Sequence, residues 1–364
     1  MEHYNPIFSK VPTLRFPEFA GEWQDTTLGN VCVYRKTRRT AEKKNYISTE
    51  NILQNYQGVE RFTSNESISG DGFNKNDILM GNIRPYLKKV YYADFDGVCN
   101  ADVLVFKSNF INPHFLYCRL ANDTFINYVM KSVKGSKMPR GDKSHIMQYP
   151  LSIPGEAEQS KISNFIELLT SRIQVQNKII SKYETLIKGL CDMIFRHNKS
   201  VSLSDLVKCK TSALQENTVS TCHRGEYKVL GASGAIAAID TYQFEESGIL
   251  VLKDGSKAGK IQFAQGKYSV VGTSVVLIPN EACDARYLYF AMSSIDFEKY
   301  KVGSGIPHIY FKDYSNERIY YPEKALRKKI IKTLDFYETR VEIEREMLSA
   351  MQKQKAFLLQ SMFI

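Results

Sequence analysis

Two stretches of the chain repeat apolar side chains at alternating spacings of four and three residues, the pattern of a helix that packs along another helix. The stripe of the first stretch is Ile162, Ile166, Leu169, Ile173, Gln176, Ile180, Tyr183, Ile187, Leu190 and Ile194. An offset of 168 residues gives the second stripe, which is Ile330, Leu334, Tyr337, Val341, Glu344, Leu348, Met351, Lys355, Leu358 and Met362. Each stretch predicts a long helix that leaves the preceding globule, because residues 157–195 alone would extend about 58 Å.

We expect these two helices to pack on each other, since each needs a partner for its apolar stripe. The alternative, a helix lying on its own domain, is disfavoured by the length. The positions expected to pair are Ile166, Leu169, Ile173, Gln176, Ile180, Leu334, Tyr337, Val341, Glu344 and Leu348. If the helices are antiparallel, the polar side chains of Gln176 and Glu344 meet at the midpoint and specify the register at some cost in stability. Otherwise both side chains reach solvent.

Short apolar runs separated by glycines precede each long helix. Residues 77–80 and 103–106 in the first half, and residues 249–252 and 275–278 in the second half, predict strands joined by turns. Short helices are expected within residues 113–129 and 285–300. Each half therefore predicts a mixed α/β globule.

The two halves repeat one another. Residues 98–105 match 270–277, and residues 115–120 match 287–292, both at an offset of 172. The Gly-Ser-x-x-Pro segments at 135–139 and 303–307, the Ile-Pro and Tyr-Pro pairs at 153 and 321, and residues 193–195 with 361–363 match at 168. Five matches in the same order predict a tandem duplication with pseudo-twofold symmetry.

Composition restricts the class of partner. The chain has 49 Lys and Arg residues against 39 Asp and Glu residues, and the net charge of +10 favours a polyanionic partner. Apolar runs are short, so neither a transmembrane segment nor a signal peptide is expected. Seven scattered cysteines without a C-x-x-C pair argue for reduced thiols in the cytoplasm and against a zinc site.

Two motifs imitate catalytic sites. Asn112-Pro-His-Phe resembles the Asn-Pro-Pro-Tyr/Phe motif of adenine methyltransferases, but its second proline is His114 and no glycine-rich cofactor loop precedes it. A helix N-terminus is the preferred interpretation. Gly255-Ser-Lys-Ala-Gly-Lys has one residue too few for a phosphate-binding loop and Ile261 in place of serine or threonine, so a glycine-rich hairpin is favoured. We expect no catalytic residue and no metal site.

Basic residues near glycines are the candidate DNA contacts, because glycine and serine allow close approach to a phosphate and lysine supplies charge. An ordinary solvated surface is the alternative interpretation. In the first half the candidates are Arg35, Lys36, Arg38, Arg39, Lys43, Lys44, Arg84, Lys88, Lys89, Lys134, Gly135, Ser136, Lys137 and Arg140. In the second half they are Lys253, Lys257, Lys260, Gly303, Ser304 and His308.

Several segments resemble the specificity (S) subunits of type I restriction-modification enzymes. The opening Val11-Pro-Thr-Leu-Arg-Phe-Pro-Glu-Phe-Ala-Gly-Glu-Trp and the helix entry Ile153-Pro-Gly-Glu-Ala-Glu-Gln-Ser-Lys-Ile carry the resemblance. The helix end Leu186-Ile-Lys-Gly-Leu-Cys-Asp-Met-Ile-Phe is similar to the family too. The second helix departs from the pattern, because Lys324-Ala-Leu-Arg-Lys-Lys-Ile lacks the Glu-Gln pair.

The resemblance implies two α/β target recognition domains joined by two long antiparallel coiled-coil helices. The expected boundaries are 1–155 and 199–322 for the recognition domains, and 156–198 and 323–364 for the spacer helices. Each domain would read one half of a split, asymmetric DNA sequence, and the helices would set the spacing. The helices would also dock two methyltransferase (M) subunits, and two restriction/translocase (R) subunits would join in the full enzyme. The resemblance places S-adenosylmethionine, ATP and magnesium in those partner subunits and none of them in this chain.

Other functions remain open on the residues alone. A stand-alone DNA-binding protein, one half of a dimer, a coiled-coil adaptor, and a degenerate methyltransferase or nuclease are the alternatives. An enzyme would require a glycine-rich cofactor loop or clustered metal-binding carboxylates, and neither stands out. The two globules differ outside the shared blocks, so a non-palindromic target is expected.

Overall fold

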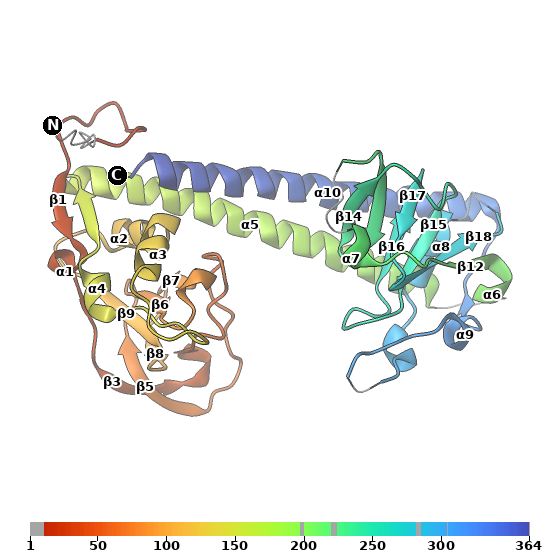
Figure 1. The fold of residues 1–364 in the computed structure, drawn as a ribbon, viewed down its shortest axis with the longest axis horizontal. Coiled ribbons are helices and arrows are strands. Elements are labelled where there is room, and N and C mark those ends of the chain that lie inside the picture. Colours follow the sequence, from red (N-terminus) through yellow and green to blue (C-terminus); the bar gives the residue numbers. More distant parts are fainter. Residues whose placement is uncertain (1–10, 197–199, 220–223, 282–284, 304, 364) are drawn as a thin grey trace. The chain divides into compact units, whose positions relative to one another are not determined.

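The computed structural model describes residues 11–196, 200–219, 224–281, 285–303 and 305–363, and the chain folds into two compact units (Figure 1). The first unit comprises Met1–Gln176 and Met347–Ile364, and the second comprises Asn177–Glu346. Two long helices, α5 (Glu156–Phe195) and α10 (Lys324–Ser361), contribute to both units. The expected mixed α/β architecture with two long helices is confirmed.

Within the described residues, the first unit contains ten short strands, four short α-helices, and parts of the long helices α5 and α10. Its strands are β1 (Gln24–Thr27), β2 (Cys32–Tyr34), β3 (Arg38–Glu42), β4 (Tyr46–Ile47), β5 (Ser67–Phe73), β6 (Ile78–Gly81), β7 (Val90–Tyr92), β8 (Gly97–Cys99), β9 (Val103–Ser108) and β10 (Pro150–Ile153). Its shorter helices are α1 (Leu28–Val31), η1 (Lys43–Asn45), η2 (Pro85–Leu87), α2 (Pro113–Leu120), α3 (Asp123–Met130) and α4 (Lys143–Met147).

The second unit repeats much of this order. Its strands are β11 (Val201–Ser202), β12 (Val207–Thr211), β13 (Tyr227–Gly231), β14 (Gly234–Ile239), β15 (Gly248–Leu252), β16 (Ile261–Ala264), β17 (Tyr268–Val270), β18 (Ser274–Pro279) and β19 (Arg318–Ile319). Its shorter helices are α6 (Leu203–Leu206), α7 (Glu216–Val219), α8 (Ala285–Met292), η4 (Phe297–Tyr300) and α9 (Phe311–Tyr314).

One four-stranded sheet is common to the two units. Its order is β2-β9-β6-β7 in the first unit and β12-β18-β15-β16 in the second. The register is also the same, because Ile78 faces Phe106 and Ile249 faces Leu277 at an offset of 171 residues. The offset of 172 predicted for residues 98–105 is therefore wrong by one residue in these strands. The central strands are apolar and buried on both faces, which is why they form short continuous runs of Val, Ile and Leu.

The second sheet is where the units diverge. The first unit has the four-stranded order β3-β5-β8-β4, whereas the second has the three-stranded order β14-β13-β17. A small two-stranded antiparallel sheet closes each domain: β1 pairs with β10, and β11 pairs with β19. The entry and the exit of each domain therefore lie side by side.

Each globular core continues onto the long helices. In the first unit the Phe363 ring, just beyond the end of α10, lies 5.3 Å from that of Phe115 on α2. In the second unit the ring of Phe195, at the end of α5, lies 5.7 Å from that of Tyr287 on α8. Each domain thus rests on the beginning of one long helix and the end of the other, at positions related by the repeat.

The two long helices are antiparallel within the second unit. Glu184 of α5 pairs with Arg345 of α10 at 2.5 Å, whereas Phe195 of α5 shares a core with Leu334 of α10. Later residues of one helix therefore meet earlier residues of the other. No helix in the described ranges combines the length and the apolar character that crossing a membrane requires.

Candidate nucleic-acid interface

Two loops lie together at one end of the shared sheet in the first unit. The loop from β6 to β7 contains Arg84, whose backbone N–H donates to the Pro139 carbonyl at 2.8 Å. Pro139 belongs to the Gly-Ser-x-x-Pro segment, where Lys134 and Arg140 exchange two backbone hydrogen bonds of 2.9 Å. Gly135 has φ +89°, a left-handed conformation that glycine adopts without strain, and this closes the turn.

The second unit builds the same pair of loops. The N–H of Gly255, between β15 and β16, donates to the Pro307 carbonyl at 2.9 Å. Val302 and His308 exchange backbone hydrogen bonds of 2.9 and 2.8 Å, and Gly303 has φ +97°. The lysine- and glycine-rich motif 255–260 therefore lies in a β-hairpin. Ser304, also a candidate, lies outside the described residues.

The structure places the candidate cations in two groups. Six of the candidate cations are exposed and form no hydrogen bond or ion pair within the described part of the chain. They are Lys36, Arg38, Arg84, Lys137, Lys257 and Lys260. Gly135, Ser136 and Gly303 are exposed as well. These positions are open to a phosphate or a base, and their contact with DNA stays a prediction.

The other candidate side chains have partners inside the chain. The partners are Asp77 for Arg35, Asn74 for Arg39, Glu66 for Lys43, Glu42 for Lys44, Asp123 for Lys88, the Thr49 carbonyl for Lys89, Asp142 for Lys134, Asp102 for Arg140, and Asp254 for Lys253 and His308. An ion pair between exposed side chains contributes about 0–1 kcal/mol, so the exposed lysines and arginines among them can exchange a carboxylate for a phosphate at little cost.

Arg35 differs from the other paired cations. Its guanidinium donates to both oxygens of Asp77 at 2.6 and 3.1 Å, and the carboxylate is almost fully buried. Asp77 also accepts from the backbone N–H of Asn74 at 2.7 Å. A bidentate pair with one buried partner fixes β2 against the turn before β6, so Arg35 has a structural role within the domain.

Three carboxylates that pair with the basic side chains of these loops were not among the residues predicted from the sequence: Asp102, Asp123 and Asp142. Asp142 accepts from the backbone N–H groups of Ser144 and His145 at the start of α4 and pairs with Lys134 at 2.5 Å. The Lys134 ammonium and the His145 N–H lower the pKa of Asp142 to about 2. An aspartate directly before a helix is a recognisable cap signal. Asp102 and Asp123 have no such signal, because their partners are remote in sequence.

The motif at Asn112 is a helix cap. The Asn112 side-chain oxygen accepts from the backbone N–H groups of His114 and Phe115 at 2.9 and 3.0 Å. Its own N–H donates to Gln159 of α5 at 2.9 Å. The Ser163 hydroxyl of α5 also donates to the Asn112 side-chain oxygen at 3.1 Å. That side chain is therefore occupied in capping α2 and in holding it to α5.

The Glu-Gln pair of the first long helix connects three segments. Glu158 is buried and accepts two hydrogen bonds of 2.7 Å from Arg15 of the opening segment. Gln159 donates to the Pro154 carbonyl at 2.8 Å. In α10 the equivalent residue, Arg327, donates to the Pro322 carbonyl at 2.7 Å, so the contact survives without the glutamine.

The residues expected to pair the long helices all lie on the protected faces of α5 and α10. Ile166, Gln176, Ile180, Leu334, Val341 and Glu344 are buried, and Leu169, Ile173, Tyr337 and Leu348 are half-buried. Gln176 and Glu344 are therefore not solvent-exposed side chains, and Glu344 accepts from Arg340 of its own helix at 2.9 Å. Contact between Gln176 and Glu344 stays a prediction.

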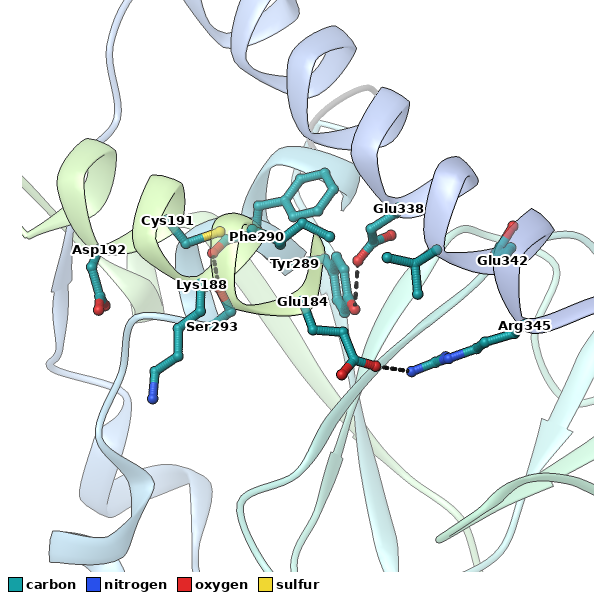
Figure 2. Close-up of a pocket in the computed structure, with 12 residues that line it drawn as sticks. Glu184, Lys188, Cys191, Asp192, Tyr289, Phe290, Ser293, Glu338, Glu342 and Arg345 are labelled. Carbon is teal, nitrogen blue, oxygen red and sulfur yellow. Dashed lines mark hydrogen bonds and ion pairs between the residues drawn. The ribbon is translucent and has the colours of Figure 1, made fainter. Parts of the chain in front are cut away.

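A pocket of about 450 Å³ lies between α5, α8 and α10 in the second unit (Figure 2). Glu184 pairs with Arg345 across it, and Tyr289 donates to Glu338 at 3.1 Å. Burial raises the pKa of the Cys191 thiol, which disfavours the reactive thiolate. The described residues also contain no cluster of three or more potential metal ligands.

Sequence comparisons give one family. A match to the family described as type I restriction modification DNA specificity domain covers residues 20–185 and again 196–352. The EcoDI specificity subunit of Escherichia coli is 29% identical over 128 residues, covering 34% of this chain and 29% of that protein. The MjaVIII specificity subunit of Methanocaldococcus jannaschii is 27% identical over 122 residues, covering 32% and 28%. The matched segments thus span less than a third of either relative.

Solved structures share the fold over nearly the whole chain. A type I restriction-modification S subunit from M. genitalium superposes with a TM-score of 0.63 at 15% identity, covering 97% of this chain and 99% of that one. A chain from a study of assembly and conformational transition of the type I system gives 0.55 at 16% identity, covering 93% and 96%. The family match extends through both units and most of both long helices, so the chain belongs to the type I restriction-modification DNA specificity family and carries two copies of its domain.

Proposed function

We propose that this chain is the DNA sequence-specificity subunit of a type I restriction-modification system. Each recognition domain binds one half of a split, asymmetric target, and the two long helices set the distance between the halves. The observation that carries the proposal is the repeated pair of loops, which the same hydrogen bonds build at the end of the shared sheet in both units and which carries exposed basic side chains in each. A pair of loops that occurs once in each unit of one chain fits a DNA target with two half-sites.

Differences between the units support an asymmetric target. The shared sheet keeps its strand order, but the second sheet has four strands in one unit and three in the other. The exposed candidate cations that have no partner among the described residues also differ: they are Lys36, Arg38, Arg84 and Lys137 in the first unit, and Lys257 and Lys260 in the second. Different side chains on similar loops favour different base sequences.

Exposed apolar residues on the helices support a role in docking other subunits. On α5 these are Phe165, Leu168, Val175, Leu186 and Met193, and on α10 they are Leu326, Phe336, Ile343, Met347 and Phe357. Large exposed apolar side chains recurring along two helices are typical of a protein interface. Methyltransferase subunits, two in the proposed assembly, are the partners that would cover them.

Catalysis belongs to partner subunits in this proposal. The methyltransferase subunits bind S-adenosylmethionine and methylate adenine, and two restriction subunits, where present, use ATP and magnesium. This chain supplies specificity alone. The cap geometry of Asn112 supports that division, because the one segment similar to a methyltransferase motif is occupied in capping a helix.

The test is a genome-wide map of methylated adenines. The chain is expressed with its methyltransferase subunit in a host that lacks adenine methylation, and each subunit is omitted in turn as a control. A split, non-palindromic methylated motif that requires both proteins is the expected result. A soluble complex of the two proteins that produces no motif would contradict the proposal and favour a coiled-coil adaptor.

A further inference from the structure

Two basic residues in the first unit occupy backbone positions that normally suit glycine. Arg84 and Lys88, which flank η2, have φ +52° and +55°. In this left-handed region the Cβ of an L-residue lies too close to the following carbonyl oxygen, which raises the conformational energy. Glycine has no Cβ and avoids this strain. A strained residue persists where its side chain performs a task that glycine cannot.

The second unit shows what each position requires. An offset of 171 residues, the offset of the surrounding strands, relates Arg84 to Gly255 and Lys88 to Gly259. Gly255 and Gly259 have φ +91° and +90°. In each unit the backbone N–H of Arg84 or Gly255 donates to a proline carbonyl on the neighbouring loop. The carbonyl of Arg84 accepts from the N–H of Leu87, and that of Gly255 accepts from the N–H of Ala258, both at 2.9 Å. The two loops therefore share these hydrogen bonds and a positive φ, and Arg84 carries a side chain where Gly255 has none.

Lys88 has a partner within the chain that accounts for its side chain. Its ammonium pairs with Asp123 at the start of α3 at 2.8 Å, and Asp123 also accepts from Tyr56 at 3.0 Å. In the second unit a Cβ at Gly259 would lie 2.5 Å from the Phe297 side chain, so glycine is required there.

Arg84 has no such partner in the described part of the chain. Its side chain is exposed and forms no hydrogen bond or ion pair with any residue that the structure describes. A Cβ at the equivalent Gly255 would meet no atom within 4 Å, so neither crowding nor packing decides the residue there. The strained arginine of the first unit is thus left without an internal explanation.

The backbone around Arg84 is rigid. Its N–H and carbonyl are both hydrogen-bonded, and the following residue, Pro85, is buried and has a fixed φ. The arginine guanidinium is a planar fork of donors that can contact two acceptors at once, which suits recognition of a base edge. The ammonium of a lysine, such as Lys137 on the adjacent loop, acts as a point charge, which suits a phosphate.

We propose that Arg84 is a specificity-determining residue of the first recognition domain, and that its guanidinium donates two hydrogen bonds to O6 and N7 of one guanine in the major groove. This inference rests on the proposed function. Guanine is the base that presents two acceptors matching the arginine fork. Because Gly255 has no side chain, this contact is confined to one half-site.

The test compares three versions of the chain in complex with the methyltransferase subunit. Arg84→Gly removes the side chain and relieves the left-handed strain, so loss of binding cannot be attributed to unfolding. Lys137→Ala removes a neighbouring exposed cation and serves as the matched control. We expect Arg84→Gly to retain the methylated motif except at one guanine of one half-site, where any base becomes acceptable.

Binding to duplexes carrying the mapped motif gives the second readout. Replacing the G·C pair should weaken wild-type binding by about 10- to 100-fold and leave Arg84→Gly binding unchanged. Lys137→Ala should weaken all duplexes alike and reduce the slope of log affinity against log salt by about 0.9.

Three outcomes would overturn the inference and leave the proposed function standing. They are an Arg84→Gly motif identical to that of the wild type, a uniform loss of binding that lowers the salt slope as Lys137→Ala does, and a first half-site without guanine. Absence of any methylated motif with the wild-type chain would overturn the proposed function itself, and this inference with it.

Discussion

His114 of α2 is enclosed by aromatic rings and by groups from the long helices. The rings of Tyr92 and Tyr117 lie 5.0 and 5.6 Å from the imidazole, and the Cys118 sulfur lies 3.8 Å from Nδ1. Burial lowers the pKa of His114, while Glu167 raises it and Lys355 lowers it by smaller amounts. The folded protein therefore keeps this imidazole neutral at a pH where the unfolded chain begins to protonate it.

Stability should fall as the medium becomes more acidic because of this residue. The folded-state pKa lies below the unfolded value of about 6.5, so the unfolded chain binds the extra proton first and the free energy of unfolding decreases below that pH. The contribution of one such group is at most about 1.4 kcal/mol per pH unit. We expect His114→Gln to lose less stability than the wild type between pH 7.5 and 5.5 in urea unfolding. Equal losses for the two proteins would contradict this account.

At the scale of elements, the long helices depend on their apolar stripes. No stripe position of α5 or α10 is exposed, whereas large apolar residues off the stripe, such as Leu168 and Phe336, are 71% and 62% exposed. Ile166 and Leu334 occupy the same place in the repeat, and both are fully buried. Ile166 belongs to the core of the first unit and Leu334 to that of the second.

Truncating either of these residues should destabilise its unit. Ile166→Ala and Leu334→Ala each remove buried methylene groups and leave a cavity, which costs about 2–5 kcal/mol. Phe336→Ala is the matched control, two residues beyond Leu334 on the exposed side, and should change stability by less than about 0.5 kcal/mol. Chemical denaturation of the free chain measures all three. A cost for Phe336→Ala as large as that for Leu334→Ala would show that the stripe does not define the protected face.

At the scale of the whole molecule, the duplication makes each recognition domain a module with adjoining ends. Gln24 faces Ile153 across the β1–β10 pair, and Val201 faces Ile319 across the β11–β19 pair. The proline carbonyl after each exit strand is held by the following helix, through Gln159 in one copy and Arg327 in the other. The two modules thus join the helices through equivalent contacts.

This arrangement predicts that one domain can replace the other. A chain in which residues 24–153 are inserted in place of residues 201–319 should fold, because the ends of the inserted module pair with each other. With two copies of the first recognition domain related by the repeat, the methylated motif should become palindromic and contain the first half-site twice. A methylation map of the graft checks this. A motif that still contains the original second half-site would refute the modular assignment.

Local patterns in the sequence were sufficient to predict the long helices, the core strands and the repetition of the two units. The four-three spacing specified the long helices, the apolar runs specified the core strands, and the repeated blocks specified two similar units. These features follow from periodicities that each short segment carries by itself. The Asn112 motif was likewise identifiable as a cap from its position before a helix.

Only the tertiary structure decided which charged residues are engaged and which are open. Arg35 is held by Asp77, Lys88 by Asp123 and Arg140 by Asp102, across 35 to 42 residues of chain. No spacing rule marks such pairs, because the fold brings their partners together from separate strands, loops and helices. The left-handed backbone of Arg84 is hidden from the sequence for the same reason. Its conformation follows from a hydrogen bond to Pro139 on another loop, and arginine carries no local signal for it.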